Sequence, residues 1–178
     1  MLQDRIDIIR GDITRLQVDA VVNAANSALC GGGGVDGSIH RAAGPQLLQA
    51  CRTLGRCETG YAKATKAYNL PAQWVFHAVG PVWRGGDANE DAQLASCYRE
   101  CFRLAQQYAV TSMAFPAISC GVYRFPIARA CQIAMREVMA GLQHNPQIER
   151  VIFACFDGQV EDATRKAYAE IVGSDESS

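Results

Sequence analysis

Short apolar runs alternate with amphipathic segments along the chain. Runs rich in β-branched and aromatic residues predict strands around Ile6 and Ile8, ending at Gly11-Asp12, and over residues 18–23, 74–79, 112–118 and 150–156. Residues 62–67 alternate small and polar side chains and predict a further strand. Apolar stripes at helical spacing predict helices over residues 38–54, with a break at Gly44-Pro45, and over 89–108, 127–142 and 160–171.

This alternation of strands and helices determines the fold class. Because parallel strands need a crossover connection, usually a helix, the pattern favours an α/β protein built as an α/β/α sandwich around a mostly parallel sheet. In such sheets ligands bind beyond the carboxyl ends of the strands. The loops that follow the strands are therefore the places to search for a functional site.

Length and charge narrow the class of protein. With 178 residues the chain has the size of one domain, which we place at residues 1–172, and the polar residues 173–178 are expected to form a frayed tail. The net charge of −1 argues against a general binder of nucleic acid or anionic membranes, but allows one small anionic ligand. No signal-peptide pattern and no apolar run of roughly 18 residues occur. We therefore expect a cytoplasmic protein without membrane contact.

The cysteines call for a separate explanation. There are eight: Cys30, Cys51, Cys57, Cys97, Cys101, Cys120, Cys131 and Cys155. None forms a C-x-x-C pair, and no Cys/His cluster has zinc-finger spacing, so we expect no metal. Several occupy core positions of predicted helices and strands, and Cys97 and Cys101 share one helix face. Buried, reduced thiols are thus favoured over a disulfide framework.

The loop after the first strand is Gly11-Asp12-Ile13-Thr14. An aspartate at the end of a strand can accept hydrogen bonds from an exocyclic amine of a ligand, or it can cap the following turn. Taken alone, the motif favours the cap.

The loop after the second strand contains Asn26, four consecutive glycines from Gly31 to Gly34, and Asp36. Glycines let the backbone approach a ligand closely and point several N–H groups at an anion, and a following helix start adds a favourable dipole. A flexible linker is disfavoured between a buried strand and a helix. Gly32, Gly34 and Gly37 also match G-x-G-x-x-G, but residues 24–30 separate them from the strand, which argues against a Rossmann dehydrogenase.

The loop after the 112–118 strand carries Ser119, Gly121 and Tyr123. This loop is either a tight strand-to-helix turn or a second anion nest, in which successive backbone N–H groups point at one anion. Paired with the glycine loop, the nest is favoured, because two such loops could hold a diphosphate from both sides while Tyr123 covers a sugar.

Five segments occur in a fixed order: Gly11-Asp-Ile-Thr14, Val18-Asp-Ala-Val-Val-Asn-Ala-Ala-Asn26, Gly31-Gly-Gly-Gly-Val-Asp-Gly-Ser-Ile-His-Arg-Ala-Ala-Gly44, His77-Ala-Val-Gly-Pro-Val-Trp83 and Phe115-Pro-Ala-Ile-Ser-Cys-Gly-Val-Tyr123. Together they resemble the MacroD-type macrodomains, and most closely the bacterial O-acetyl-ADP-ribose deacetylase subfamily. The resemblance runs from about Arg5 to Ile171. It implies a three-layer α/β/α fold around a mixed six-stranded sheet, with ADP-ribose in a cleft over the strand ends.

The resemblance also implies roles for single residues. Asp12 and Ile13 would hold the adenine, and Phe156 would flank it. The diphosphate would lie between two sets of residues, Gly34 and Val35 on one side and Ser119, Cys120, Gly121 and Val122 on the other. Tyr123 and Asn26 would contact the distal ribose. Asp36 would position or deprotonate the attacking water, and the sequence leaves open whether the substrate diphosphate shares in orienting that water. By its spacing, His40 lies one helical turn after Asp36 and could orient it.

The implied reaction is the hydrolysis of acyl esters of ADP-ribose without a cofactor or metal, on O-acetyl-ADP-ribose or on mono-ADP-ribosyl esters of Asp or Glu in proteins. Two alternatives stay open: a non-catalytic ADP-ribose reader, against which the Asn26/Asp36 pair argues, and a regulator that contacts ribonuclease III directly.

His77, inside a strand, is favoured as a core residue. Ser119 and Cys120 lack a paired base and are disfavoured as nucleophiles. Cys120 stands where relatives often have threonine, and the connection between Cys51 and Cys57 is shortened.

Overall fold

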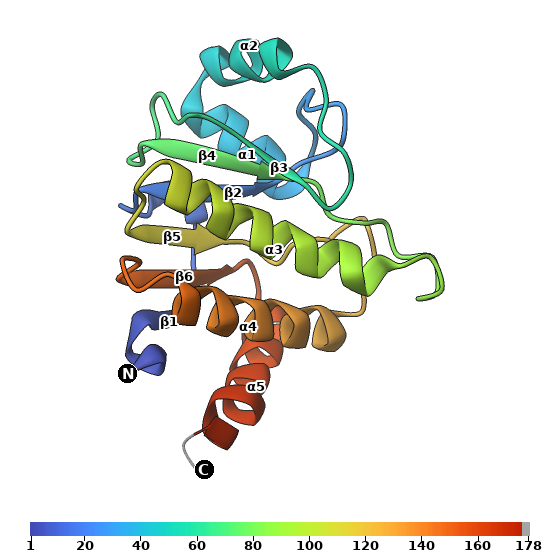
Figure 1. Ribbon diagram of the computed structural model, residues 1–178. Coiled ribbons are helices and arrows are strands. Elements are labelled where there is room, and N and C mark those ends of the chain that lie inside the picture. The colour runs from blue at the N-terminus through green and yellow to red at the C-terminus, as the bar shows by residue number, and fades with distance from the viewer. Residues whose placement is uncertain (176–178) are drawn as a thin grey trace.

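Six strands form one sheet that lies between two layers of helices in the computed structural model, which describes residues 1–175 (Figure 1). The strands are β1 (Ile6–Arg10), β2 (Ala20–Ala24), β3 (Ala62–Lys66), β4 (Trp74–Ala78), β5 (Ser112–Phe115) and β6 (Arg150–Cys155). The α-helices are α1 (Gly34–Ala43), α2 (Pro45–Leu54), α3 (Glu90–Gln107), α4 (Ile127–His144) and α5 (Gly158–Asp175). Two short 3-10 helices, η1 (Leu2–Arg5) and η2 (Ile13–Arg15), flank β1.

The strand order across the sheet is β1-β6-β5-β2-β4-β3. All neighbouring strands are parallel except β3, which pairs antiparallel with β4 at one edge. The mixed, mostly parallel six-stranded sheet is therefore confirmed. Because β1, β6, β5, β2 and β4 run in the same direction, their carboxyl ends meet at one edge of the sheet.

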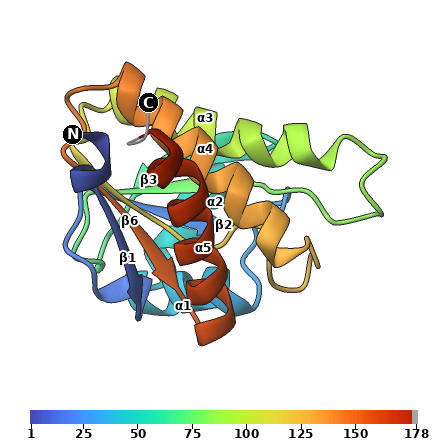
Figure 2. The ribbon, with the colours of Figure 1, turned by 90° about the horizontal axis from the view of Figure 1, so that it is seen from below.

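Alternation along the central strands produces two cores. Ala20 and Val22 of β2 belong to a large core beneath α3, α4 and α5, whereas Val21 faces a smaller core beneath α1 and α2. Seen from below, α5 lies alongside α4 (Figure 2). Strands buried on both faces explain why the sequence shows continuous apolar runs and not strict polar alternation.

Several element boundaries differ from those predicted. The helix expected over residues 38–54 begins already at Gly34. Its predicted break at Gly44-Pro45 is confirmed, because Gly44, with a φ of 91°, ends α1 and Pro45 opens α2. Strand β5 stops at Phe115, because Pro116 has no N–H to continue the ladder. Helix α5 runs on to Asp175, beyond the predicted end at residue 171. Of the tail predicted to be frayed, residues 176–178 lie outside the described residues.

The cysteines behave as core residues. All eight, which lie in the described part of the chain, are free thiols, and seven of them are buried, with Cys30 exposed. Cys97 and Cys101 are both 0% exposed on the inner face of α3, as predicted. Within residues 1–175 no helix is both long and apolar enough to cross a membrane.

Candidate functional site

The predicted site loops gather along the carboxyl edge of the sheet. Backbone hydrogen bonds link them in pairs: Gly11 N–H donates to Cys155 O at 3.2 Å, Ala25 N–H to Ala78 O at 2.9 Å, and Trp83 N–H to Tyr123 O at 2.8 Å. The strand order then places Asp12 at one end of this edge, the Ser119–Tyr123 loop in the middle and the loop after β4 at the other end. An elongated ligand could therefore lie across several strand ends.

Asp12 caps the turn that follows β1. Its Oδ1 accepts hydrogen bonds from Thr14 Oγ1 at 2.6 Å and Thr14 N at 2.9 Å, and these bonds lower the pKa of the carboxyl group. The cap favoured by the sequence is thus confirmed. Its Oδ2 lies 3.6 Å from Arg15 Nε, and the side chain is half exposed, so the carboxylate can still accept a hydrogen bond from a ligand. Ile13 beside it is buried, and Phe156, directly after β6, is 52% exposed.

The glycine segment is partly loop and partly helix. Gly34, Val35 and Asp36, predicted to precede the helix, form the first turn of α1, and Gly33 is its N-cap residue without a capping side chain. The first backbone N–H groups of a helix have no partner within it and favour an anion. Gly34 has a φ of 58°, and apart from its chain neighbours and the backbone of its own helix no described atom lies within 4 Å of the position its Cβ would take. The space beside this helix start is open.

Asp36 and Asn26 converge over Gly32. A Cβ built on Gly32 would lie 3.2 Å from Asp36 Oδ2 and 3.7 Å from Asn26 Nδ2, so a glycine here leaves room beside both groups. Asn26 Nδ2 also donates to Gly31 O at 2.8 Å, which connects the glycine segment to the residues that directly follow β2. The structure thus brings together the two residues for which a catalytic role is predicted.

Two polar side chains contact the second carboxylate oxygen of Asp36, Oδ1. Asp36 is only 6% exposed, and its Oδ1 accepts from Asn23 Nδ2 at 2.7 Å, while His40 Nε2 lies 3.3 Å from the same oxygen. His40 therefore contacts Asp36 as predicted. Asn23, which the sequence analysis did not single out, is 0% exposed. The signal was present, because an asparagine stands inside an otherwise apolar buried strand.

His77 is fully buried, which confirms the core position predicted for it. Its Nδ1 lies 3.2 Å from Asn23 Nδ2, and its Nε2 lies 2.9 Å from Thr65 Oγ1 and 3.7 Å from Cys51 Sγ. Burial, with a smaller contribution from His40, lowers the pKa of His77 from 6.5 to about 3. The imidazole is therefore neutral near pH 7, and its position in the interior makes it unsuited to contact a substrate.

This histidine makes the stability of the fold depend on pH. The unfolded chain binds a proton on His77 below about pH 6.5 that the folded chain binds only near pH 3, so the free energy of unfolding falls as the pH drops through this window. At pH 5 we expect a loss of roughly 2 kcal/mol from this group. Urea unfolding at pH 5 and pH 7 measures it. The loss should shrink in His77→Asn and persist in His144→Gln, and a wild type equally stable at both pH values would contradict the assignment.

The Ser119–Tyr123 loop is tight and faces solvent on its outer side. Ser119 has a φ of 66°, and its backbone oxygen accepts from Phe125 N–H at 3.0 Å. Gly121 and Val122 are exposed, Val122 by 91%, and apart from its chain neighbours no described residue lies within 4 Å of the position of a Cβ on Gly121. Ser119 Oγ is buried and has no hydrogen-bond partner among the described residues. Without a base beside it, Ser119 is unsuited to act as a nucleophile.

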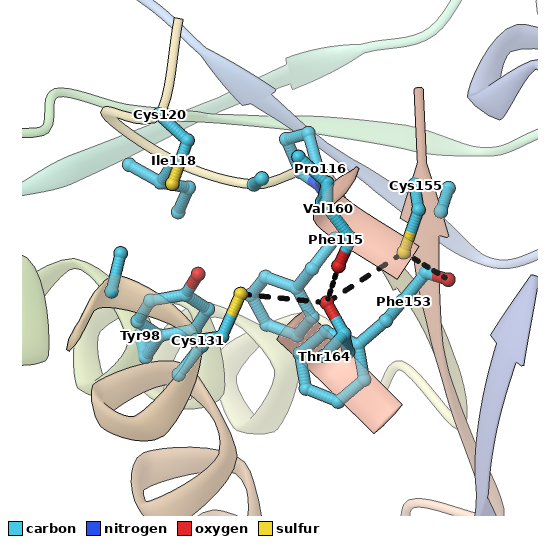
Figure 3. A pocket seen from close by; sticks show the side chains of 14 residues that line it. Tyr98, Phe115, Pro116, Ile118, Cys120, Cys131, Phe153, Cys155, Val160 and Thr164 are labelled. Carbon is cyan, nitrogen blue, oxygen red and sulfur yellow. Dashed lines mark hydrogen bonds between the residues drawn. The ribbon is translucent and has the colours of Figure 1, made fainter. Parts of the chain in front are cut away.

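A mostly apolar cavity lies beneath this loop (Figure 3). Cys120 lines it from above, and Cys131 Sγ and Cys155 Sγ lie 3.5 Å and 3.7 Å from Thr164 Oγ1. Burial raises the pKa of the Cys120 thiol to about 12, which argues against a thiolate nucleophile. Cys120, which stands where relatives often have threonine, therefore has its side chain on the inner side of the loop.

Glu90 supports the loop after β4, a role that the sequence analysis missed. Its carboxylate is 1% exposed and accepts hydrogen bonds from the backbone N–H groups of Arg84, Gly86 and Ala88 at 2.9, 2.9 and 2.6 Å. These bonds, that of Arg84 foremost, lower the pKa of Glu90 to about 2. Through Trp83, this loop is bonded to Tyr123. The sequence offered one signal for this role of Glu90, which directly follows a polar segment that contains glycines.

A second hollow, of about 330 Å³, lies at this end of the edge. Ser27, which follows Asn26, lines it together with Gly80, Glu90 and Tyr123. It adjoins the place where Asn26 and Tyr123 are predicted to hold a sugar. Within residues 1–175 no group of three His, Cys, Asp or Glu side chains could hold a metal ion.

Fold and site together define a class: an α/β/α protein with two glycine-containing loops, predicted to bind an anion, at the carboxyl edge of a mixed sheet. The chain belongs to the Macro domain family, whose family model matches residues 22–134. It is 54% identical over 160 residues to an O-acetyl-ADP-ribose deacetylase of Enterobacter cloacae subsp. cloacae, covering 88% of this chain and 89% of that protein.

Solved macrodomain structures share the fold. The Oceanobacillus iheyensis macrodomain with ADP has a TM-score of 0.91 and 34% identity, covering 98% of this chain and 95% of that one. The Trypanosoma brucei macrodomain in complex with ADP-ribose has a TM-score of 0.85 and 42% identity, covering 91% and 68%. These likenesses confirm the family and the three-layer architecture predicted from the sequence.

Proposed function

We propose that this protein binds ADP-ribose along the carboxyl edge of the sheet and hydrolyses acyl esters of it, converting O-acetyl-ADP-ribose to ADP-ribose and acetate. The observation that carries the proposal is the convergence of Asp36 and Asn26 over Gly32, beside two open anion-binding loops. The name of the Enterobacter relative, at 54% identity, and the ADP-ribose in the Trypanosoma structure support the substrate class.

The order of the loops fits the order of groups in the ligand. Asp12, Ile13 and Phe156 lie at the β1 end and would hold the adenine. The diphosphate would lie between the start of α1, at Gly34 and Val35, and the backbone of residues 119–122, where N–H groups can donate to it. The distal ribose would then reach Asn26 and Tyr123.

The chemistry follows from the position of Asp36. Its Oδ1 is occupied by Asn23 and His40, whereas Oδ2 faces the point above Gly32 that Asn26 also faces. A water bound beside Oδ2 attacks the ester carbonyl carbon and gives one proton to the carboxylate of Asp36. The bond from the carbonyl carbon to the ribose oxygen then breaks, and the ribose oxygen takes up that proton, which leaves ADP-ribose and the free acid. A positioned carboxylate typically contributes about 10²- to 10⁴-fold to such a step.

The position of the new bond can be tested in ¹⁸O-labelled water. Attack on the carbonyl carbon places one labelled oxygen in the acetate, which mass spectrometry detects. Acetate released without label would contradict this mechanism, because the bond between the ribose carbon and its oxygen would then be the one that breaks.

Free ADP-ribose is expected to bind far more tightly than AMP. We expect micromolar affinity for ADP-ribose, about −8 kcal/mol, because the two anion-binding loops and Asn26 address the diphosphate and the distal ribose, which AMP largely lacks. Titration calorimetry with both ligands measures the difference. Equal affinities would show that the adenine end alone determines binding.

Mono-ADP-ribosyl esters of Asp or Glu side chains in proteins contain the same type of bond. The hollow of about 330 Å³ beside Tyr123 supports them as a second substrate class, because it leaves space for a group larger than acetyl. Contact with ribonuclease III stays a prediction from the resemblance alone.

A further inference from the structure

A buried row of polar side chains runs across three adjacent strands behind Asp36. Asn23 of β2 and His77 of β4 are direct partners in the parallel ladder, and Thr65 of β3 follows on the far side of His77. All three are less than a tenth exposed. The side chains lie on the sheet face that α1 covers. Asp36, in the first turn of α1, contacts Asn23 on this face.

Each hydrogen bond in this row has a defined direction. The carboxylate of Asp36 can only accept, so the nitrogen of the Asn23 amide faces it, at 2.7 Å. The second hydrogen of the same nitrogen then faces His77 Nδ1, at 3.2 Å, and this atom must accept. A neutral imidazole carries its single proton on Nε2 in this case, 2.9 Å from Thr65 Oγ1.

Stability alone does not explain this arrangement. Asn23 Oδ1 is buried without a hydrogen-bond partner among the described residues, which is unfavourable compared with an apolar side chain at the same place. The neighbouring residues Val21 and Val22 show that the strand accommodates apolar side chains here. Asn23 therefore points to a requirement for an N–H donor directed at Asp36.

We propose that Asn23 is a positioning residue, oriented by His77, that binds Asp36 Oδ1 and so directs Oδ2 towards the side of Gly32 that Asn26 also faces, where the attacking water would bind. The inference rests on the proposed function, because it concerns how Asp36 serves that reaction. Asn23 is buried behind Asp36, so it contributes to turnover through Asp36 and has no contact with the ligand.

The test compares turnover with binding in Asn23→Leu. We expect kcat for O-acetyl-ADP-ribose to fall at least about tenfold, while KM and the calorimetric affinity for ADP-ribose change less than about threefold. The matched control is Thr164→Val, which removes a buried hydroxyl from the other core and should leave kcat unchanged. Circular dichroism and thermal unfolding establish that each variant is folded.

Two further variants separate positioning from packing. Adding Asn23→Leu to Asp36→Ala should lower kcat no further than Asp36→Ala alone, because Asn23 acts only through Asp36. In Asn23→Asp, the new carboxyl faces Asp36, with His40 and His77 nearby, and can donate only when the pair of carboxyls shares a proton. Its kcat relative to wild type should therefore rise as the pH is lowered from 8 to 6.

The outcomes are distinguishable from a failure of the proposed function. A wild-type protein that hydrolyses no ester would contradict the proposed function itself. An active wild type together with a folded Asn23→Leu of unchanged kcat overturns the positioning role alone. If Asn23→Leu does not fold, Asn23→Asp decides, and a pH profile of kcat parallel to that of wild type counts against the proposal.

Discussion

Replacing Asp36 with alanine is expected to lower the rate of ester hydrolysis at least about 100-fold while changing the affinity for ADP-ribose little. The reason lies in the position of the carboxylate. It is 6% exposed, is bound from behind by Asn23, and presents Oδ2 beside Asn26 over Gly32. A group that acts on the water in the transition state, and not on bound ADP-ribose, lowers turnover on removal without weakening ground-state binding.

Deacetylation rates and calorimetric affinities of a small set of variants measure this prediction. Asn26→Ala should lower both quantities, because Asn26 is predicted to contact the ribose. The double variant should be less than additive if the two residues act on one water. The control is Asp4→Ala at the exposed amino-terminal end, which should match wild type. If Asp36→Ala turns over like wild type, Asp36 serves only the start of α1 and the catalytic role is wrong.

Replacing Gly121 with glutamate is expected to abolish ADP-ribose binding, with a loss of affinity of at least about 100-fold, while the fold stays intact. Apart from its chain neighbours, no described residue lies within 4 Å of the position of its Cβ, and its φ is not positive, so the fold tolerates a side chain here. That side chain would add bulk and negative charge where the diphosphate is predicted to lie. Gly34→Glu should act alike, although its φ of 58° adds backbone strain.

Calorimetry together with circular dichroism measures the effect of both glycine variants. Gly173→Glu is the matched control, because it makes the same change of charge at an open position of α5 far along the chain. Wild-type affinity in a folded Gly121→Glu would mean that the Ser119–Tyr123 loop does not hold a phosphate. The same result for Gly34→Glu would remove that role from the start of α1.

The sequence predicted the order of strands and helices because the pattern of apolar residues is strong throughout. It placed the start of α1 too late, since four glycines have low helix propensity and Ser38 is a favourable N-cap residue. Tertiary contacts override that preference: Asp36 is held by Asn23, and a Cβ on Gly37 would lie 2.6 Å from Gly32 O. A glycine at position 37 is thus required by packing.

The candidate site was predictable where motifs lie in single loops and was missed where it depends on strand register. Asn23 and His77 are separated by 54 residues and meet only because β2 and β4 pair in one register. The support that Glu90 gives to the loop after β4 likewise depends on how that loop folds back on the helix. For Asp12, the cap uses only Oδ1, so Oδ2 is left for the predicted adenine contact.

The central claim is that this macrodomain turns over an ester of ADP-ribose and does not merely bind it. The most direct measurement incubates the purified protein with O-acetyl-ADP-ribose and, separately, with a protein carrying a mono-ADP-ribosyl-Glu ester, and follows the products by mass. We expect free ADP-ribose with acetate from the first substrate, lost in the Asp36→Ala, Asn26→Ala double variant. Ester left intact by a wild type that binds ADP-ribose at micromolar affinity would contradict the claim and identify the protein as a reader.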